Sequence, residues 1–256
     1  MAKLHILGSG AALPGPQRDT TAMALQVGQS LTLIEAGGST LQKLQRLRLS
    51  LDQVDRILLT HGHPDHSYGL PAVLLGLWLN DRQRSLPVCA PAHGLERLQQ
   101  VVSLFGSDEW PDMYPVSYQT IPLQERVPVL ETPDLRVVAS PGKHVVPVVG
   151  LRIELSRPRY TIVFSSDTEP ADTIVRLAEG ADLLIHECTA VEGQPKGHTA
   201  AADAGEVARR ASVKQLMLIH LPHMTRDEEA AMGALAAKAF GSDVSLAEDG
   251  LAITLG

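Results

Sequence analysis

The sequence predicts an α/β protein in which two stacked sheets are flanked by helices. Early strands form a hairpin, later strands alternate with helices, and both halves run from strands to a strand, a polar loop and a helix. Of the 256 residues 44% are hydrophobic, which is enough to bury a sizeable core, and only 4% are aromatic. We expect residues 1–256 to form a single domain, because no repeat or linker divides them.

The first half of the chain is predicted to begin with strands. A strand at residues 3–7 leads into a glycine- and proline-rich loop, interpreted as a tight turn in preference to a phosphate cradle because no complete phosphate-binding motif follows. Strands at 22–27 and 30–35 flank Gly28-Gln29, a hairpin signal. Apolar spacing then predicts a helix at 41–47, a buried strand at 56–59, a helix at 69–79, a strand at 86–90 and a helix at 93–105.

The second half is predicted to alternate strands with helices. The stretch from 106 to 114 has no regular period, and both a mobile lid and an ordinary surface loop remain open for it. After it we expect strands at 117–122, 135–140, 148–155 and 160–164, a helix at 170–179, a strand at 183–185, a helix at 199–211, a strand at 215–219, a helix at 226–240 and two short closing strands.

Composition excludes several classes of protein. The formal net charge of −7 argues against a protein-wide electrostatic footprint for nucleic acid, although a local basic patch stays open. Cys89 and Cys188 are the two cysteines, so a disulfide framework is not expected and a reducing cytoplasm fits. The N-terminus does not resemble a signal peptide, and no apolar run is long enough to span a membrane. We therefore expect a cytoplasmic protein that does not associate with membranes.

Three imidazoles and a carboxylate fall within one short loop, His61-Gly62-His63-Pro64-Asp65-His66. The loop joins an apolar strand to an apolar helix, where a rigid scaffold commonly presents functional groups. On a turning backbone His61 and His63 project to one side, while Asp65 and His66 can turn to another. That arrangement suits two metal ions side by side, and imidazole nitrogen with carboxylate oxygen is a ligand set for zinc, manganese or iron.

Further candidate ligands follow other predicted strands. His144, Asp167 and His220 each come shortly after an apolar run. With the first cluster they make seven potential ligands, which two adjacent metals need if one carboxylate bridges them. His93, near the start of a predicted helix, is interpreted as a cap or surface residue. His223 is interpreted as an exposed residue in preference to a substrate contact.

The histidine cluster after a hydrophobic strand resembles the signature motif of the metallo-β-lactamase superfamily. The resemblance implies a four-layer αββα sandwich of two mixed sheets and two divalent metal ions, with zinc favoured and manganese or iron as alternatives. It implies that the first metal is held by His61, His63 and His144, the second by Asp65, His66 and His220, and that Asp167 bridges them. Two cations would lower the pKa of a shared water to give the attacking hydroxide, which Asp65 is expected to orient.

Two further segments resemble the ribonuclease Z branch of this family. The segment His186-Glu187-Cys188-Thr189 resembles its H-E-A-T motif with Cys in place of Ala, and Gly197-His198-Thr199 resembles its H-S-T motif with Thr in place of Ser. The resemblance implies that His198 is the general acid for the leaving oxygen and that Glu187 is its partner. The alternative is that His198 caps the helix that follows.

The chain departs from that branch in one important respect, and its ending, Leu221-Pro222-His223-Met224, also differs from the small and basic residues usual there. Only about two dozen residues separate His144 from Asp167, which leaves no room for the long arm with which such enzymes commonly grip tRNA. Full-length tRNA is therefore a doubtful substrate, and a small or short nucleotide phosphodiester is favoured. The predicted function is a dinuclear metal-dependent phosphodiesterase. A homodimer is common among such proteins, but oligomeric state is not readable from this sequence.

Three other functions compete with this prediction. The same metals would also hydrolyse a lactone, thioester or amide, and only the His198–Glu187 apparatus favours phosphoryl chemistry. Redox di-iron chemistry is disfavoured, because such relatives usually carry a carboxylate where His63 stands. A metal- or partner-binding module without catalysis is disfavoured by the complete ligand set, since decayed relatives usually lose some ligands.

Overall fold

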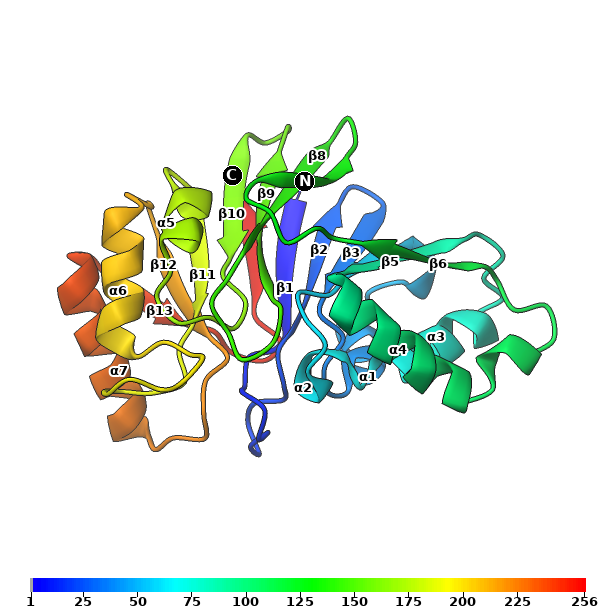
Figure 1. Ribbon diagram of the computed structural model, residues 1–256, viewed down its shortest axis with the longest axis horizontal. Coiled ribbons are helices and arrows are strands. Elements are labelled where there is room, and N and C mark those ends of the chain that lie inside the picture. Colours follow the sequence, from blue (N-terminus) through cyan, green and yellow to red (C-terminus); the bar gives the residue numbers. More distant parts are fainter. Residues whose placement is uncertain (1) are drawn as a thin grey trace.

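Two seven-stranded sheets lie face to face, and helices cover the outer face of each (Figure 1). The computed structural model describes residues 2–256. This arrangement confirms the predicted four-layer αββα sandwich of two mixed sheets.

The first sheet joins both ends of the described chain. Its first and last strands in sequence pair antiparallel, with Ala2 opposite Leu255. The strands from β3 to β6 run parallel to one another. In spatial order the sheet consists of β14 (Ala252–Leu255), β1 (Ala2–Gly8), β2 (Ala22–Val27), β3 (Ser30–Ile34), β4 (Val54–Leu58), β5 (Leu86–Ala90) and β6 (Val116–Thr120).

The second sheet comes from the second half of the chain. Its order is β13 (Val244–Leu246), β12 (Leu216–Ile219), β11 (Leu183–Glu187), β10 (Tyr160–Phe164), β9 (Val149–Leu155), β8 (Leu135–Pro141) and β7 (Val127–Glu131). Strands β10 to β13 are parallel, and β9 runs antiparallel to both β8 and β10. The ends of β8, β10, β11 and β12 therefore meet at one edge of this sheet.

The helices divide between the two outer faces (Figure 1). The first sheet carries α1 (Thr40–Arg46), α2 (Pro64–Ser67), α3 (Leu70–Leu79) and α4 (Ala92–Leu104), and the second carries α5 (Asp172–Ala178), α6 (Ala201–Arg210) and α7 (Arg226–Phe240). Short 3₁₀ turns lie at Leu51–Gln53 and Ser107–Glu109. Helix α7 begins at a capping box formed by Thr225 and Glu228 and ends at Gly241, whose φ is +85°.

The core forms three apolar layers that match the sandwich. The inner layer lies between the sheets and includes Leu4, Ile6, Leu151 and Phe164. One outer layer packs α1, α3 and α4 on the first sheet, and the other packs α5, α6 and α7 on the second. Aliphatic side chains dominate all three layers, as the low aromatic content predicts.

One strand was not predicted from the sequence. Strand β7 lies at the edge of the second sheet, and its pairing with β8 shifts register between Pro128 and Leu130. Proline lacks the N–H needed for a ladder hydrogen bond, so a proline within the segment lowers its resemblance to a strand. The edge position makes the proline tolerable, but edge position is a property of the fold and not of the local sequence.

The stretch from 106 to 114 is packed against helix α3. The Tyr114 hydroxyl donates to the Leu74 carbonyl at 3.1 Å, and Trp78 Nε1 donates to the Pro111 carbonyl at 2.8 Å. Tyr114 is almost fully buried. These contacts favour the surface-loop interpretation over the mobile lid.

Within residues 2–256, none of the helices has both the length and the apolar character needed to cross a membrane.

Candidate metal centre

The seven predicted ligands gather where the strand ends of the two sheets meet. Two candidate groups have four members each: His61, His63, His144 and Asp167 form the first, and Asp65, His66, Asp167 and His220 form the second. Two smaller candidate groups overlap them: Glu35, His61 and His66, and Glu187, His198 and His220. Within each group the candidate ligand atoms all lie within 4.8 Å of one another. Asp167 belongs to both of the larger groups, which is the position that a bridging carboxylate requires.

The first group brings imidazole nitrogens unusually close together. Nε2 of His61 lies 3.1 Å from Nδ1 of His63, and Nε2 of His144 lies 3.2 Å from that same nitrogen. Oδ2 of Asp167 is 3.7 Å from Nε2 of His61. A single proton can link only two of these three nitrogens, whereas one metal cation can bind all three.

The second group is more deeply buried and is built around two carboxylates. Nε2 of His66 lies 3.3 Å from Oδ2 of Asp65 and 3.3 Å from Oδ2 of Asp167. Nε2 of His220 lies 3.3 Å and 3.5 Å from the same two oxygens. His66 is fully buried, and Asp167 and His220 are each 2% exposed.

The pKa shifts of His61, Asp65 and Asp167 favour the protonation states that bind a cation. Burial and the neighbouring imidazole of His66 hold the pKa of His61 well below its ordinary value. Burial opposes ionisation of Asp65 and Asp167, but interactions with His220 and His66 outweigh it and lower the pKa of both carboxyls. Neutral imidazole and ionised carboxylate are the protonation states in which these side chains bind metals.

His66 behaves differently from His61. Burial opposes its charge, but Asp167 and Glu35 outweigh burial and raise the pKa of His66 well above its ordinary value. Nε2 of His66 and Oδ1 of Asp167 are buried and have no hydrogen-bond partner among the described residues. Buried polar atoms left without partners are costly, and a bound cation in place of the His66 proton would satisfy them. The donor set therefore fits a metal site.

Three residues at or next to the candidate site have a strained backbone. Glu35, Ser166 and His220 have φ values of 64°, 55° and 58°, which non-glycine residues rarely adopt. Each lies just beyond the end of a strand, at β3, β10 and β12 respectively. Such strain tends to persist where the surrounding structure over-determines a functional geometry.

The histidine loop is also packed closely against helix α4. A Cβ on Gly62 would lie 2.9 Å from the Cα of Gly94. Glycine at position 62 lets the loop between His61 and His63 approach the helix this closely, and a Cβ on Gly94 would make a tight contact of 3.2 Å with the Gly62 nitrogen.

Sequence reasoning missed one supporting carboxylate, Glu35. Its Oε1 lies 3.3 Å from Nδ1 of His66, and its Oε2 accepts from the Thr60 backbone N–H at 3.2 Å. The Thr60 hydroxyl donates to Glu35 and lies 3.1 Å from Nδ1 of His61. Such partners commonly orient ligating imidazoles. The available signal was a carboxylate at the end of a predicted strand, the same signal that singled out Asp167.

The predicted general acid His198 and its predicted partner Glu187 lie beside the cluster. Nδ1 of His198 is 3.1 Å from Oε1 of Glu187, which also accepts from the backbone N–H groups of Thr168 and Thr199 at 3.1 Å each. The His198 ring lies 4.9 Å from that of His144 and 5.5 Å from that of His220, between ring centroids. Helix α6 has Ala200 as its N-cap residue, so His198 is not the cap.

The environment of Glu187 differs from that of the other carboxylates. Burial, and secondly the nearby charge of Asp167, raise the pKa of Glu187 well above its ordinary value. The side chain of His198 is 24% exposed, so its ring reaches the solvent side while Glu187 stays inside. The bond to Glu187 occupies Nδ1 and leaves Nε2 of His198 as the nitrogen for a substrate.

Two other histidines stand apart from these groups. His93 lies in the first turn of α4, and His223 lies against the loop at Gly15, where a Cβ on the glycine would be 3.1 Å from its Nδ1. Neither belongs to a metal-binding group of the described residues.

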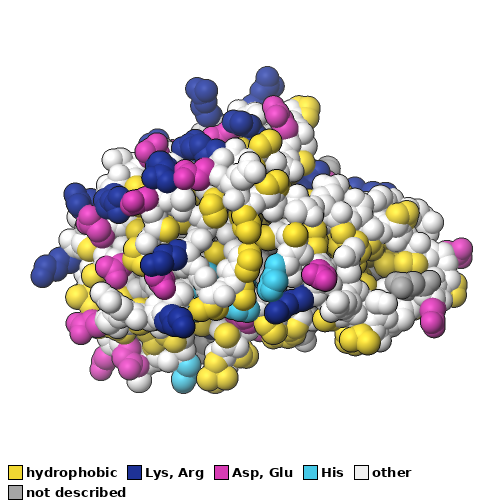
Figure 2. Space-filling model, viewed as in Figure 1, with side chains coloured by type: hydrophobic (Ala, Val, Ile, Leu, Met, Phe, Trp, Pro, Cys, Tyr) yellow, Lys and Arg dark blue, Asp and Glu magenta, His cyan; other side chains and the backbone are white. Residues whose placement is uncertain are grey.

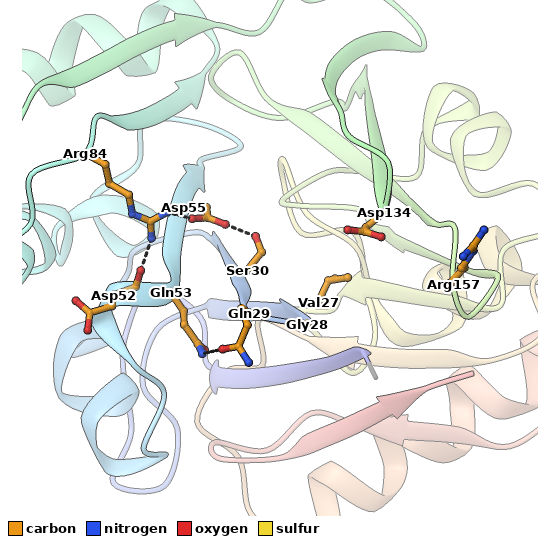
Figure 3. Close-up of a pocket in the computed structure, with 10 residues that line it drawn as sticks. All are labelled: Val27, Gly28, Gln29, Ser30, Asp52, Gln53, Asp55, Arg84, Asp134 and Arg157. Atoms are coloured by element: carbon orange, nitrogen blue, oxygen red, sulfur yellow. Dashed lines mark hydrogen bonds and ion pairs between the residues drawn. The ribbon is translucent and has the colours of Figure 1, made fainter.

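A separate hollow lies at the other end of β4. This cavity has a volume of about 650 Å³ and is lined by polar residues around the turn between β2 and β3 (Figure 3). Its side chains bind one another, since Asp55 accepts from Ser30 and from Arg84, and Gln53 donates to Gln29 at 2.5 Å. Because these lining side chains are paired with one another, we assign no reactive group to this cavity, in contrast to the histidine cluster.

The surface around the cluster is mixed in charge. Figure 2 shows histidine side chains reaching the surface near the middle of one face, with lysine and arginine interspersed among acidic residues elsewhere on that face. The face shown therefore does not present a continuous basic surface.

Comparisons with known proteins agree with this geometry. The family model described as "Beta-lactamase superfamily domain" matches residues 32–221. Ribonuclease Z of Methanothermobacter thermautotrophicus is 29% identical over 86% of this chain and 87% of that protein. The metallo-β-lactamase fold protein YhfI of Bacillus subtilis superimposes with a TM-score of 0.85 at 22% identity, covering 100% of this chain and 99% of that one. The short form of human tRNase Z superimposes with a TM-score of 0.81 at 23% identity, covering 99% of each chain.

Proposed function

The chain belongs to the β-lactamase superfamily, and from this premise we propose that it is a metal-dependent phosphodiesterase of the ribonuclease Z type. The observation that carries the proposal is the pairing of His198 with Glu187 beside two groups of candidate ligands that share Asp167. The relatives named ribonuclease Z support the same class of reaction.

We assign the ligands as the sequence predicts. His61, His63 and His144 would hold one divalent ion, Asp65, His66 and His220 a second, and Asp167 would contact both. Zinc is the first choice for this donor set, with manganese or iron as alternatives. When bound, such ions lower the pKa of water and polarise the phosphoryl group under attack.

The chain's own residues then control protons and orientation. Asp65 is 8% exposed, so water can reach its carboxylate. The carboxylate would accept a hydrogen bond from the attacking water and so orient it. As the bond between phosphorus and the leaving oxygen breaks, the proton on Nε2 of His198 passes to that oxygen. Glu187 lies within hydrogen-bond distance of Nδ1 of His198 and so fixes the orientation of the ring for this transfer.

The substrate is proposed to be a small or short nucleotide phosphodiester. The connection between β9 and β10, which lies between His144 and Asp167, is a turn of residues 156–159. A turn of this size offers little surface for gripping a folded RNA. With a net charge of −7, the chain would also gain little from the counterion release that drives binding to long nucleic acids.

A lactone, thioester or amide hydrolase is the main alternative. The ligand groups suit both chemistries. An acid such as His198 argues against a thioester, since a thiolate leaves without protonation, whereas the leaving groups of a diester, a lactone and an amide all gain from a proton. The relatives named ribonuclease Z therefore favour the diester over the lactone and the amide. Turnover of a lactone or thioester with no turnover of any diester would favour this alternative.

The first test uses purified protein loaded with zinc or manganese. It should hydrolyse bis(p-nitrophenyl) phosphate, and a His63→Ala variant should lose both bound metal and turnover. No turnover above this control would contradict the proposal.

The second test concerns His198. A His198→Ala variant should keep its metal and lose about 100-fold or more in turnover of an RNA dinucleotide, the range expected for a general acid. Metal content is measured by atomic emission. A parallel loss of metal would make His198 a ligand instead.

A further inference from the structure

The loop that carries His198 is held by a residue outside the proposed metal ligands and outside the pair of His198 with Glu187. The peptide groups of Gly197 make two hydrogen bonds at the base of this loop. The Gly197 N–H donates to Oε1 of Glu169 at 3.0 Å, and the Gly197 carbonyl lies 2.6 Å from Nδ1 of His144. Gly197 directly precedes His198, so both bonds act on the backbone that positions the imidazole.

Other hydrogen bonds hold the loop from the side of His198 and Thr199: the His198 N–H donates to the Pro195 carbonyl at 3.0 Å, and the Thr199 N–H and hydroxyl donate to Glu187 and to the Thr168 carbonyl. On the side of Gly197, the bonds to Glu169 and His144 hold the loop. Residues 191–198 contain neither helix nor strand, and Gly193 and Gly197 have φ values of 99° and 78°. A Cβ on Gly197 would lie 3.0 Å from Nδ1 of His144 and 3.1 Å from Cγ1 of Val145. The close fit at Gly197 therefore depends on the two hydrogen bonds and on glycine itself.

Glu169 is itself fixed by the segments that bear candidate ligands. It lies two residues after Asp167, and its backbone N–H donates to the carbonyl of Lys143 at 2.7 Å. Its second carboxylate oxygen lies 2.5 Å from Nζ of Lys143, the residue before His144. Glu169 thus ties the loop to the ends of β8 and β10 at once.

The same residues form one wall of the space beside His198. A cavity of about 520 Å³ is lined by Lys143, Glu169, Lys196 and His198, among others. A displaced loop would change both the cavity and the direction of Nε2.

We propose that Glu169 is a positioning residue for His198, acting through the Gly197 N–H. This inference rests on the proposed function, in which His198 protonates the leaving oxygen. Loss of the Glu169 carboxylate should therefore impair only reactions whose leaving group needs a proton. The Glu169 side chain is 28% exposed, so we expect a partial loss and not the complete loss of His198→Ala.

The test compares two diesters that differ in leaving group. The leaving group of a dinucleotide is an alkoxide, which needs a proton, whereas the leaving group of a nucleotide p-nitrophenyl ester is a stable phenolate. Glu169→Ala should lower kcat for the dinucleotide about 10- to 100-fold, the range seen when residues supporting a site are removed. The nitrophenyl ester should change less than about threefold, and zinc content should not change.

Two matched variants separate positioning from a general effect. Glu169→Gln keeps an oxygen that can accept from the Gly197 N–H, so it should restore most of the dinucleotide turnover. Glu125→Ala removes another carboxylate paired with a cation, Arg176, and should have no effect. In a His198→Ala background, Glu169→Ala should cause no further loss, because the residue it positions is gone.

A measurement independent of turnover completes the test. In ¹⁵N-histidine NMR spectra, the His198 signal, assigned by its loss in His198→Ala, should shift or broaden in Glu169→Ala but not in Glu169→Gln or Glu125→Ala. An unchanged His198 signal would overturn the inference, as would an equal loss for both diesters or a loss of zinc. A wild-type protein inactive on both diesters would instead refute the proposed function, and the NMR result would still decide the role of Glu169.

Discussion

At the scale of single residues, burial without a neighbouring carboxylate to offset it keeps a histidine neutral. His186 is fully buried, and its Nδ1 donates to the Glu187 carbonyl at 2.8 Å. Burial lowers the pKa of His186 from 6.5 to about 4. The residue therefore stays neutral across the physiological range, which suits a structural part of the motif next to a reactive one.

The lowered pKa of His186 predicts a dependence of stability on pH. Below pH 6.5 the unfolded chain binds a proton at this residue while the folded chain does not. The contribution of neutral His186 to the free energy of unfolding is therefore fully present above pH 6.5 and is lost as the pH falls toward 4. The loss attributable to His186 should reach about 3 kcal/mol near pH 4. Urea unfolding of metal-free wild type and His186→Asn measures it. The advantage of the wild type over the variant should shrink by this amount between pH 7 and pH 4, and a constant difference would refute the assignment.

At the scale of elements, close helix packing sets the position of the reactive loop. Helix α6 begins at Ala201, three residues after His198, and packs against α7. A Cβ on Gly205 of α6 would lie 2.3 Å from the Ala236 carbonyl oxygen. The crossing of the two helices is therefore possible only because residue 205 lacks a side chain.

Two glycine substitutions test this packing. Gly205→Ala should force the helices apart and lower the free energy of unfolding by about 1–3 kcal/mol, the usual cost of overpacking. Gly233→Ala in α7 is the matched control, because its Cβ would meet Leu246 Cδ1 at an ordinary 3.4 Å. The control should be neutral or raise stability by about 0.5–1 kcal/mol through helix propensity. Thermal unfolding of both variants gives the comparison, and equal Tm values would show that α6 has room for a methyl group.

At the scale of the whole molecule, the candidate metal centre couples the two halves of the sandwich. His61 and His66 follow a strand of the first sheet, whereas Asp167 and His220 follow strands of the second. The Val149 N–H also donates to the Thr60 carbonyl at 3.1 Å, so backbone and candidate ligands join the sheets at the same edge. A cation shared by these residues would bridge the two sheets.

Metal removal should therefore destabilise the folded chain. Ions that bind only the native state raise stability with concentration, by about 2.7 kcal/mol at 100 times their Kd. Chelation should lower Tm, and zinc should restore it in proportion to the logarithm of its concentration. Differential scanning fluorimetry follows both effects, with Glu125→Ala expected to respond like the wild type. His61→Ala should lose most of the response, and an unchanged response would place the zinc elsewhere.

Much of the fold and the candidate site was predictable because its signals are local. Apolar periodicity located most strands and helices, and the loop from His61 to His66 concentrates four candidate ligands within six positions. His144, Asp167 and His220 were identifiable because each follows an apolar strand. Their convergence follows from the common direction of the strands that precede them, which the structure confirms. That residues 1–256 act as one domain stays a prediction.

Other features depend on contacts between distant segments, and only the tertiary structure decided them. The role of Glu35 depends on its distance from His66, and that of Glu169 depends on the Gly197 N–H 28 positions away. Whether 106–114 closes over the site was undecidable until Tyr114 was placed against α3. Local sequence determines which backbone conformations and chemical groups are available. Which of those groups meet is determined by how the two sheets pack, because that energy is shared among residues far apart in the chain.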